Sequence, residues 1–504
     1  MDNEIEEDED ENLSGALKSE FRAAPWYVSS MAIHCVVFLL LLVFAPDAPT
    51  KDRPPLIIKT ELAVEEEKLP EPINDIEEET PEIITENVTE PSPVIVTTEF
   101  EIADHNETAD EMEDSSALGD PDSISTFDSD VTGTPALMGV GASGGKGGGG
   151  RFGTRLGEKK NLVAKNGGNK HTEAAVDWGL KWLAAHQELD GHWDTAKYGG
   201  GNSDVGVTSL ALLAFLGAGN SVKFGKYRDN VKRATAWVMS KQNADGSIGP
   251  HRYESGIALM AIAESYGMSM DLNIKQSAQR IVDWAAKSQH KAGGWGYVSS
   301  SRDNRNDTSV FGWWCMGIKS AKVSGLIVPS EVFEKARDYI MQATTDPVNA
   351  DDGYGRCRTS YSSSVDNLKD VKRGGGSNRL TAVSNTCLQF LGRDRNDPQV
   401  MGTANQIIAD GVCSPATQDF YRWYYAALGM FQMGVRSDYW LKWNEPMKTS
   451  LLQMQVKEGT FKENKGSWNF EADPYGKSWG RTGETALGCL MLEVYYRYDS
   501  AHKR

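Results

Sequence analysis

The sequence predicts an all-α fold in which six helical hairpins close into a ring, joined by a disordered stalk to one N-terminal transmembrane helix. Three observations lead to this prediction. Amphipathic and apolar helical segments alternate from about residue 171, the amphipathic segments end on a shared motif, and charge divides the 504-residue chain sharply. Residues 1–150 hold 35 Asp and Glu against 7 Lys and Arg, whereas the remainder holds 36 against 45. We therefore expect a folded domain that follows a solvated acidic region.

An apolar run at residues 25–46 is predicted to cross a membrane once. It contains 20 residues from Trp26 to Ala45 without Asp, Glu, Lys or Arg, which is enough to span roughly 30 Å of hydrocarbon as a helix. Trp26 and Tyr27 suit the headgroup level of a bilayer. The acidic leader, residues 1–24, lacks the basic region of a cleaved signal peptide. An uncleaved single-pass anchor is therefore expected.

Residues 47–138, rich in Glu, Asp, Pro and Thr, are predicted to form a disordered stalk, followed by a Gly-rich flexible linker over 139–170. Gly145-Lys146-Gly147 lacks the hydroxyl residue and the strand and helix of a phosphate-binding loop. The order of leader, span and stalk resembles that of energy-transducer proteins that bridge the bacterial periplasm. This resemblance implies a cytoplasmic N-terminus and an extracytoplasmic, periplasmic C-terminal domain.

Twelve helical segments are predicted over residues 171–499, in two alternating kinds. The first kind is amphipathic, and its Trp, Leu and Ile recur at helical spacing, which predicts an outer layer. The second kind is apolar on most faces, as expected of buried helices. The amphipathic segments are 172–187, 227–242, 272–289, 329–343, 398–410 and 438–455; the apolar ones are 204–219, 253–267, 307–322, 379–392, 420–434 and 481–498.

The amphipathic segments end on a recurring Gln, Gly and large apolar residue. Gln187 and Gln242 are 55 residues apart, and Gln242 and Gln289 are 47 apart, a period typical of a helical-hairpin repeat. We expect the Gln to satisfy unpaired groups at helix ends, the Gly to permit the turn, and the Trp to pack between repeats. The copies are Gln187/Gly191/Trp193, Gln242/Gly246/Ile248, Gln289/Gly293/Trp295 and Gln455/Gly466/Trp468.

These motifs resemble the QW motifs of the prenyltransferase and squalene-oxidase repeat, the unit of terpene cyclases and protein prenyltransferases. The resemblance covers about residues 172–498 and implies an (α/α)6 toroid, with the apolar helices as an inner barrel. Its nearest counterpart is the group of bacterial membrane-anchored proteins defined only by these repeats. That group supplies a fold and no substrate.

The catalytic motifs of the resembled enzymes are not intact in this sequence. The acid of class II terpene cyclases is a DxDD motif, but Asn349 stands at its first position, so Asp351 and Asp352 are more readily explained by a turn. No His is spaced with a Cys as zinc ligands are, and no cofactor or metal site is predicted. Cys357 and Cys413 could pair outside the cytoplasm, and the absence of a basic stripe argues against nucleic-acid binding.

One group of candidate site residues remains, at the starts of the apolar helices, which a closed ring would bring to one mouth. The first interpretation of these carboxylates is helix capping, and the second is a ligand site together with nearby aromatic residues. The carboxylates are Asp204, Glu254, Asp307 and Glu484; the aromatic residues are Trp193, Tyr253, Trp295, Trp313, Trp314, Trp423 and Tyr424.

Three hypotheses about function follow. The first is a non-catalytic module that binds a ligand or a protein partner and is displayed by the tether. The second is a terpene-cyclase-like or isoprenoid-processing enzyme, and the third is a carbohydrate-active toroid that uses the mouth carboxylates. A filled ring centre favours the first, a deep apolar cavity the second, and an open acidic and aromatic cleft the third.

Overall fold

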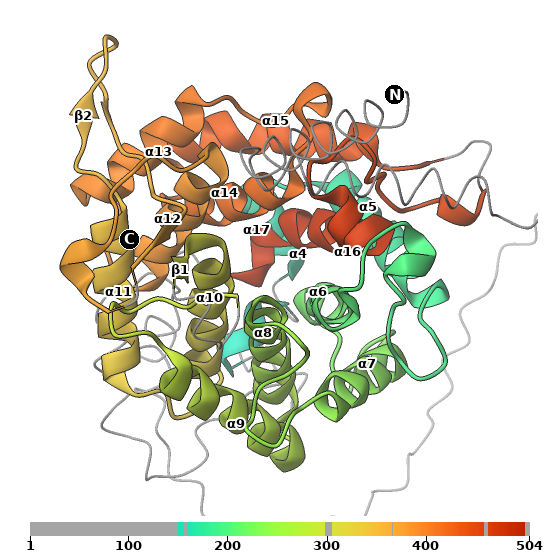
Figure 1. Cartoon of the computed structure of the whole chain (residues 1–504). Coiled ribbons are helices and arrows are strands. Elements are labelled where there is room, and N and C mark those ends of the chain that lie inside the picture. Colours follow the sequence, from blue (N-terminus) through green and yellow to red (C-terminus); the bar gives the residue numbers. More distant parts are fainter. Residues whose placement is uncertain (1–149, 156–158, 298–304, 365, 458–461, 499–504) are drawn as a thin grey trace, which may run out of the picture. The chain divides into compact units, whose positions relative to one another are not determined.

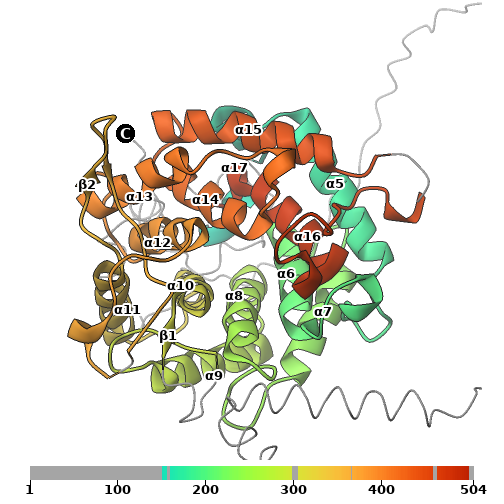
Figure 2. The ribbon, with the colours of Figure 1, turned by 45° about the horizontal axis from the view of Figure 1, so that its top comes forward.

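The computed structural model describes residues 150–155, 159–297, 305–364, 366–457 and 462–498, and in them the chain forms a closed double ring of helices. Each inner helix contacts the next one along the chain, and α16 contacts α6, which completes the circle (Figures 1 and 2). The predicted α/α toroid is confirmed. The inner helices are α6 (Asp204–Gly217), α8 (Arg252–Ser269), α10 (Thr308–Val323), α12 (Asn378–Phe390), α14 (Phe420–Gln432) and α16 (Gly476–Leu492).

The outer helices lie against the inner ring, with one apolar face inward. Charged residues cover their other face, whereas most inner helices are buried on all sides, so the two kinds of segment sort into two layers as their composition predicts. The outer helices are α5 (Lys170–Ala185), α7 (Arg228–Ser240), α9 (Leu272–Ser288), α11 (Ser330–Ala343), α13 (Pro398–Ala409) and α15 (Asp438–Met454).

The four Gln residues of the recurring motif join consecutive outer helices. Each side-chain amide donates one hydrogen bond to the carbonyl of its own motif Gly and one to a carbonyl in the following outer helix. Gln455 donates to Ala175 at 2.8 Å and so connects α15 to α5, which closes the outer ring. The other second acceptors are Asn230, Ser277 and Val332, at 3.0–3.1 Å.

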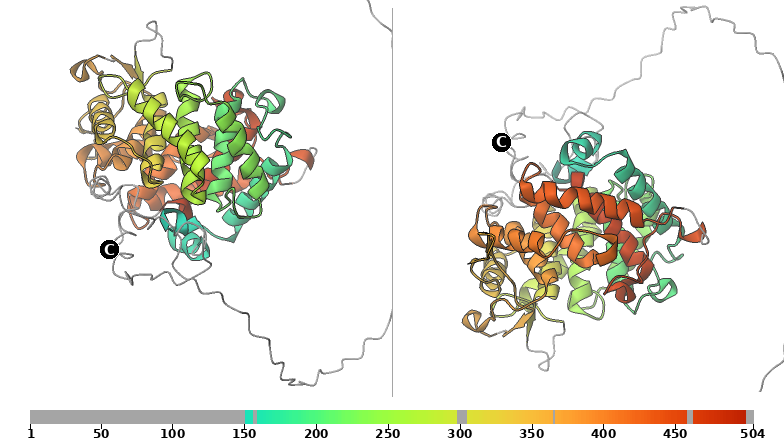
Figure 3. Two further views of the ribbon diagram at one scale, coloured as in Figure 1. Left: turned by 90° about the horizontal axis from the view of Figure 1, so that it is seen from below. Right: turned by 90° about the horizontal axis from the view of Figure 1, so that it is seen from above.

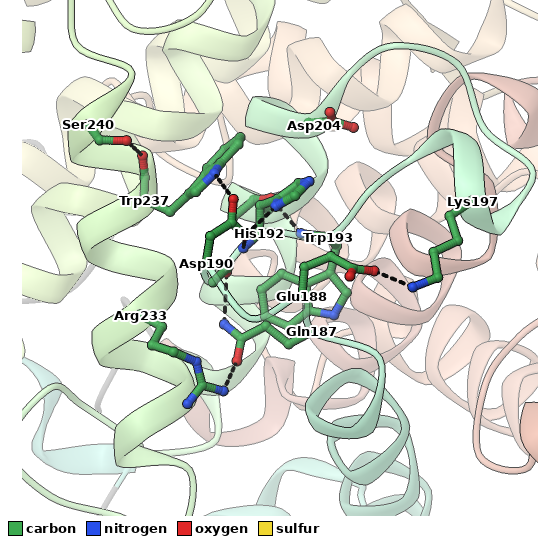
Figure 4. A network of polar contacts seen from close by, with 12 residues as sticks. Gln187, Glu188, Asp190, His192, Trp193, Lys197, Asp204, Arg233, Trp237 and Ser240 are labelled. Atoms are coloured by element: carbon green, nitrogen blue, oxygen red, sulfur yellow. Dashed lines mark hydrogen bonds and ion pairs between the residues drawn. The ribbon is translucent and has the colours of Figure 1, made fainter.

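The first copy of the motif shows how the turn is built (Figure 4). The Gln187 amide donates to Gly191 O at 2.8 Å, and its oxygen accepts from Arg233 at 2.6 Å. Gly191 has φ +108°, and a Cβ there would lie 2.5 Å from Arg233 O, so only glycine fits. The Trp193 indole donates to Leu183 O at 2.9 Å and is fully buried. The motif therefore fixes the approach of neighbouring hairpins.

The glycines of the second and fourth copies occupy equivalent positions, although the fourth copy has a longer gap. Gly246 has φ +99° and Gly466 has φ +96°, and a Cβ on either would press on a backbone carbonyl of the next outer helix, that of Arg280 or Trp178. Gly466 follows Gln455 by 11 residues, yet its carbonyl still accepts from the Gln455 amide at 2.9 Å. The longer connection therefore leaves the contact between hairpins unchanged.

The large apolar residue of the motif lies between the layers, as Trp468 shows in the fourth copy. Trp468 is fully buried, and its indole donates to Leu451 O at 2.9 Å, near the end of α15. Its ring lies between Gly179 of α5 and Gly488 of α16, where a Cβ would approach the ring to 3.1 and 2.9 Å. In the second copy Ile248 fills the equivalent place and is fully buried. A residue smaller than Trp can therefore also pack between the two layers at this position.

One end of the ring is closed by residues that precede the twelve ring helices in the sequence together with residues that follow them. The short helix η2 (Gly150–Arg155) and α4 (Lys159–Asn166) pack on α17 (Val494–Arg497), as the adjacent colours in Figure 3 show. Arg155 is buried and contacts Glu264 at 2.8 Å, and Arg497 contacts the same Glu264 oxygen at 2.9 Å. These elements lie within the range 139–170 that we expected to be a flexible linker. From Gly150 that expectation is corrected, because Arg155 and Phe152 bury against the ring.

The connection between α11 and α12 is the longest in the ring and carries most of the extended structure. Strands β2 (Val348–Asn349) and β3 (Gly355–Arg356) form a hairpin that projects from the ring (Figure 1). Strand β4 (Ser362–Ser363) pairs with β1 (Asn306–Asp307). Short 3-10 helices complete the description: η3 (Ala196–Tyr198), η4 (Leu368–Asp370), η5 (Pro415–Thr417) and η6 (Lys462–Asn464).

The predicted leader, transmembrane helix and stalk, residues 1–138, lie outside the described residues, so those expectations are untested. Within the described part of the chain, none of the helices combines the length and the apolar character needed to cross a bilayer.

Candidate functional site

The candidate site is the end of the ring at which the inner helices begin, which we call the mouth. Five of the six inner helices place a carboxylate at or near their N-termini, where the helix dipole stabilises negative charge. The predicted Asp204, Glu254, Asp307 and Glu484 all lie here, and the structure adds Asp419 before α14 and Asp473 before α16. Asp351 and Asp352 do not join them: they lie exposed in the β2–β3 turn, where Asp352 pairs with Arg356.

Asp204 and Glu254 form a carboxylate pair on neighbouring helices. Asp204 accepts a hydrogen bond from Thr195 N at 2.9 Å. The Glu254 side chain reaches the start of α6, and a Cβ on Gly206 would lie 3.3 Å from its Cγ. Burial, with a further contribution from Asp204, raises the pKa of Glu254 to about 7 even though the Gly206 amide opposes the change. Glu254 therefore holds a proton up to neutral pH.

Asp307 caps α10 with one oxygen and leaves the other without a hydrogen bond. Its Oδ1 accepts from the amide and hydroxyl of Ser309, at 2.9 and 2.6 Å. Its Oδ2 has no partner with the geometry of a hydrogen bond, although the residue is fully buried and the Tyr361 side chain lies beside it. The Ser309 hydroxyl also contacts the Tyr297 hydroxyl at 3.1 Å, which links the carboxylate to the rim. Buried carboxylate oxygens are normally hydrogen-bonded, so this oxygen keeps the capacity to accept a further hydrogen bond.

A second acidic group lies between α14 and α16. Asp473 accepts from the Phe420 and Tyr475 amides at 2.6 and 2.8 Å, and burial raises its pKa to about 6. Glu484 is fully buried with no hydrogen bond to either oxygen, and burial holds its pKa well above the ordinary value. Asp419 pairs with Arg379 at 2.7 Å. No cluster of His, Cys, Asp and Glu within the described residues is arranged to hold a metal ion.

Aromatic rings from inner helices that are not neighbours meet at the mouth. Tyr253 of α8 lies 6.2 Å from Trp479 of α16, and Trp313 of α10 lies 5.4 Å from Tyr425 of α14, as ring-centroid distances. Each pair is separated by one inner helix, so these side chains reach into the interior of the ring. Tyr424 stacks on Trp313 at 5.6 Å. The ring centre is therefore filled by side chains, and the exposed part of the site is its rim.

Four of the seven aromatic residues predicted to bind a ligand pack in the wall instead. Trp193 and Trp295 are the motif residues, and the Trp295 indole donates to Ala285 O at 3.0 Å. Trp314 stacks on Trp295 at 5.9 Å, and Trp423 packs on Phe420 at 5.5 Å. All four are fully buried. Tyr253 and Trp313 do lie at the mouth, with Tyr253 only partly buried, whereas Tyr424 is fully buried in the ring interior.

Several residues of the mouth were not predicted from the sequence. Asp419 directly precedes an apolar helix, so the rule that identified Asp204 and Asp307 could have found it. The rim tyrosines carry no such signal, because they come from loops whose positions depend on the closed ring. Tyr361 is 45% exposed and Tyr475 is 41% exposed. The unpredicted residues are Asp419, Asp473, Arg379, Tyr297, Tyr361, Tyr421, Tyr475 and Trp479.

Glu254 should make the stability of the domain depend on pH. Its pKa of about 7 in the folded state exceeds the ordinary value of 4.5, so the unfolded state binds fewer protons between these values. Stability from this group is complete below about pH 4.5 and is lost as the pH rises to 7. Relative to E254Q, which does not titrate, we expect the wild type to lose on the order of 2 kcal/mol over this range. Urea unfolding of both proteins at several pH values measures the difference, and parallel stability curves would contradict the assignment.

No protein-family model matches the sequence, and no curated protein matches it at a significant level. Similar solved structures include a family 76 alpha-1,6-mannanase from Salegentibacter sp., 10% identical over 64% of this chain and 98% of that chain, with a TM-score of 0.48. A family 76 glycoside hydrolase from a bovine Bacteroides thetaiotaomicron strain is 11% identical over 65% and 78%, with a TM-score of 0.48. The type II terpene cyclase MstE from Scytonema is 12% identical over 65% and 97%, with a TM-score of 0.43.

Likeness at this level carries no argument about ligand or reaction. The helix contacts described above establish the ring by themselves. The α/α toroid implied by the resemblance to the prenyltransferase and squalene-oxidase repeat is therefore supported. Membership of that family is not shown.

Proposed function

We propose that the toroid is a carbohydrate-binding domain whose ligand lies across the mouth. The observation that carries this proposal is the combination of partly exposed tyrosine rings with buried carboxylates. Tyr253 and Tyr297 stack at 5.8 Å with an interplanar angle of 4°, so they form a parallel aromatic pair at the rim. The Ser309 hydroxyl contacts the Tyr297 hydroxyl and donates to Asp307, so it connects this carboxylate to the tyrosine pair. Flat aromatic faces suit the apolar faces of sugar rings, and carboxylates accept hydrogen bonds from sugar hydroxyls.

The filled centre supports a rim-binding module over an isoprenoid-processing enzyme. A terpene cyclase-like site requires a deep apolar cavity, but Trp313, Tyr424 and Tyr425 occupy the ring interior and are fully buried. A glycan needs only the rim, where Tyr361 and Tyr475 are exposed. A periplasmic location on a single-pass anchor, which we propose on the sequence alone, fits a ligand outside the cell membrane.

Glycoside hydrolysis is a second candidate function, and the Asp204–Glu254 pair favours it. A carboxyl group with a pKa of about 7 is a suitable general acid at neutral pH, and a nearby carboxylate supplies the second group that glycosidases use. Release of reducing ends during incubation, abolished in E254Q, would establish hydrolysis. Binding without release leaves the binding module as the function.

Isothermal titration calorimetry of the full chain with neutral oligosaccharides of glucose, mannose and N-acetylglucosamine tests the proposal. We expect at least one series to bind, and Tyr297→Ala to weaken that binding about tenfold or more, because it removes one ring of the stacked pair. Tyr354→Ala is the matched control: Tyr354 is also an exposed tyrosine, but it lies in the β2–β3 hairpin away from the mouth. Equal loss in both variants, or no binding of any series, would overturn the proposal.

A further inference from the structure

Asp307 lies within a group of aromatic side chains that come from three inner helices and two loops. We call Tyr253, Tyr297, Trp313, Tyr361 and Tyr421 the aromatic cage. Tyr253 faces Trp313 edge to face at 6.2 Å, and Trp313 faces Tyr421 in the same manner at 6.5 Å. The Tyr421 hydroxyl reaches Ser309 O at 3.5 Å. The cage therefore surrounds the start of α10, where the carboxylate of Asp307 lies.

The negative charge of Asp307 acts on the tyrosines of this cage. Burial is the main cause of the raised pKa values of Tyr253, Tyr297, Tyr361 and Tyr421, and the charge of Asp307 raises all four further. Burial raises the pKa of Asp307 itself, and the Tyr361 side chain beside the carboxylate opposes this change, although no contact of Oδ2 meets hydrogen-bond geometry. The Asp307 carboxylate and several aromatic rings thus lie close together at the start of α10.

The arginines at the starts of neighbouring inner helices are engaged elsewhere. Arg379 of α12 pairs with Asp419 at 2.7 Å and stacks over Tyr475 at 5.0 Å. Arg252 of α8 contacts His290 at 3.2 Å and lies over Trp284 at 5.5 Å. Neither contact involves Asp307. A cation brought by a ligand suits this arrangement of a buried carboxylate and aromatic rings.

We propose that the aromatic cage and Asp307 bind a protonated or quaternary amine, so that the glycan recognised at the mouth is one built from amino sugars with free amines. Cations are attracted to the faces of aromatic rings, and the attraction is stronger where water is excluded. The carboxylate of Asp307 adds a charge-assisted hydrogen bond to an ammonium group. This inference rests on the proposed carbohydrate-binding function and specifies its ligand.

Two oligosaccharides of equal length distinguish recognition of the amine from recognition of the sugar ring. The N-acetylglucosamine pentamer is neutral, and the glucosamine pentamer carries ammonium groups when the pH is kept low enough to protonate them. Titrating the full chain with each, we expect the glucosamine pentamer to bind about tenfold more tightly or better. In Asp307→Asn, which keeps the side-chain shape and an acceptor for the α10 cap, the ratio should fall to about twofold. Asp351→Asn, an exposed Asp far from the mouth, should retain the full preference.

Competition with tetramethylammonium tests the cage without a variant. We expect it to weaken binding of the glucosamine pentamer to the wild type and to leave binding of the neutral pentamer unchanged. Equal affinity for the two pentamers overturns the amine inference while the carbohydrate proposal stands. A preference that persists in Asp307→Asn and resists tetramethylammonium overturns the assignment to this cage. Failure of both pentamers to bind overturns this inference, and the carbohydrate proposal falls only if the other neutral series also fail.

Discussion

Replacing Glu264 by alanine should lower the free energy of unfolding by about 3–5 kcal/mol, the largest effect of any single ion-pair change that we expect. Glu264 is the common partner of Arg155 and Arg497, at 2.8 and 2.9 Å, and it accepts from Ser320 at 3.2 Å. Burial alone would raise its pKa, but the two guanidinium groups hold the pKa below the usual value. Removing the carboxylate leaves two buried cations with too little compensation.

Chemical denaturation of E264A and the wild type at neutral pH measures this difference. Glu331→Ala is the matched control, because Glu331 pairs with Lys335 one helical turn away on the exposed face of α11. We expect that variant to leave the free energy of unfolding essentially unchanged, because exposed ion pairs contribute little. A loss below about 1 kcal/mol in E264A would mean that the packing of η2 and α17 against the ring does not depend on these ion pairs.

Gly293→Ala should destabilise the domain by about 3–4 kcal/mol, which is the cost of a left-handed backbone together with a steric clash. Gly293 has φ +97°, and a Cβ there would lie 2.0 Å from the Lys335 carbonyl oxygen. That oxygen belongs to the backbone of α11, so relief requires the two hairpins to separate. The same turn holds Gln289, whose amide donates to the Gly293 and Val332 carbonyls at 2.8 and 3.1 Å.

Gly353→Ala separates the backbone cost from the clash. Gly353 has φ +81° but no atoms near the position of a Cβ, since it lies in the exposed β2–β3 turn. We expect a loss of about 1–2 kcal/mol for this variant. Thermal unfolding of both variants measures the contrast. Equal losses would show that the close approach of the hairpins is not what requires glycine in the motif.

The helices could be predicted from the sequence because their signals are local. The segments predicted at 272–289 and 398–410, for example, correspond to α9 and α13 to within one residue at each end, since Asp271 and Asp397 cap them. The role of Gln187 could be predicted for the same reason: its Gly acceptor is four residues away. Local patterning therefore carries most of the fold.

The mouth could be predicted only in part because its residues meet through ring closure. Asp307 and Glu254 were found from their place before apolar helices, but their aromatic neighbours could not be ranked. Trp313 and Trp314 are adjacent in sequence, yet one faces the cage and the other the wall, and the direction depends on the helix rotation in the finished barrel. Helix α4 was missed for a related reason, because its anchoring partner, α17, lies more than 300 residues away.

The place at which the chain enters the ring determines how the domain bears force. Arg155 of η2 binds Glu264, which lies ten residues beyond Glu254 on α8 and so about 15 Å from the mouth along that helix. Tension applied through the N-terminal region therefore passes into the ion pairs of Arg155, Glu264 and Arg497 at the closed end. The carboxylates and tyrosines of the mouth lie outside this path. If the proposed carbohydrate binds at the mouth, such tension would load the closed end of the ring and not the binding site.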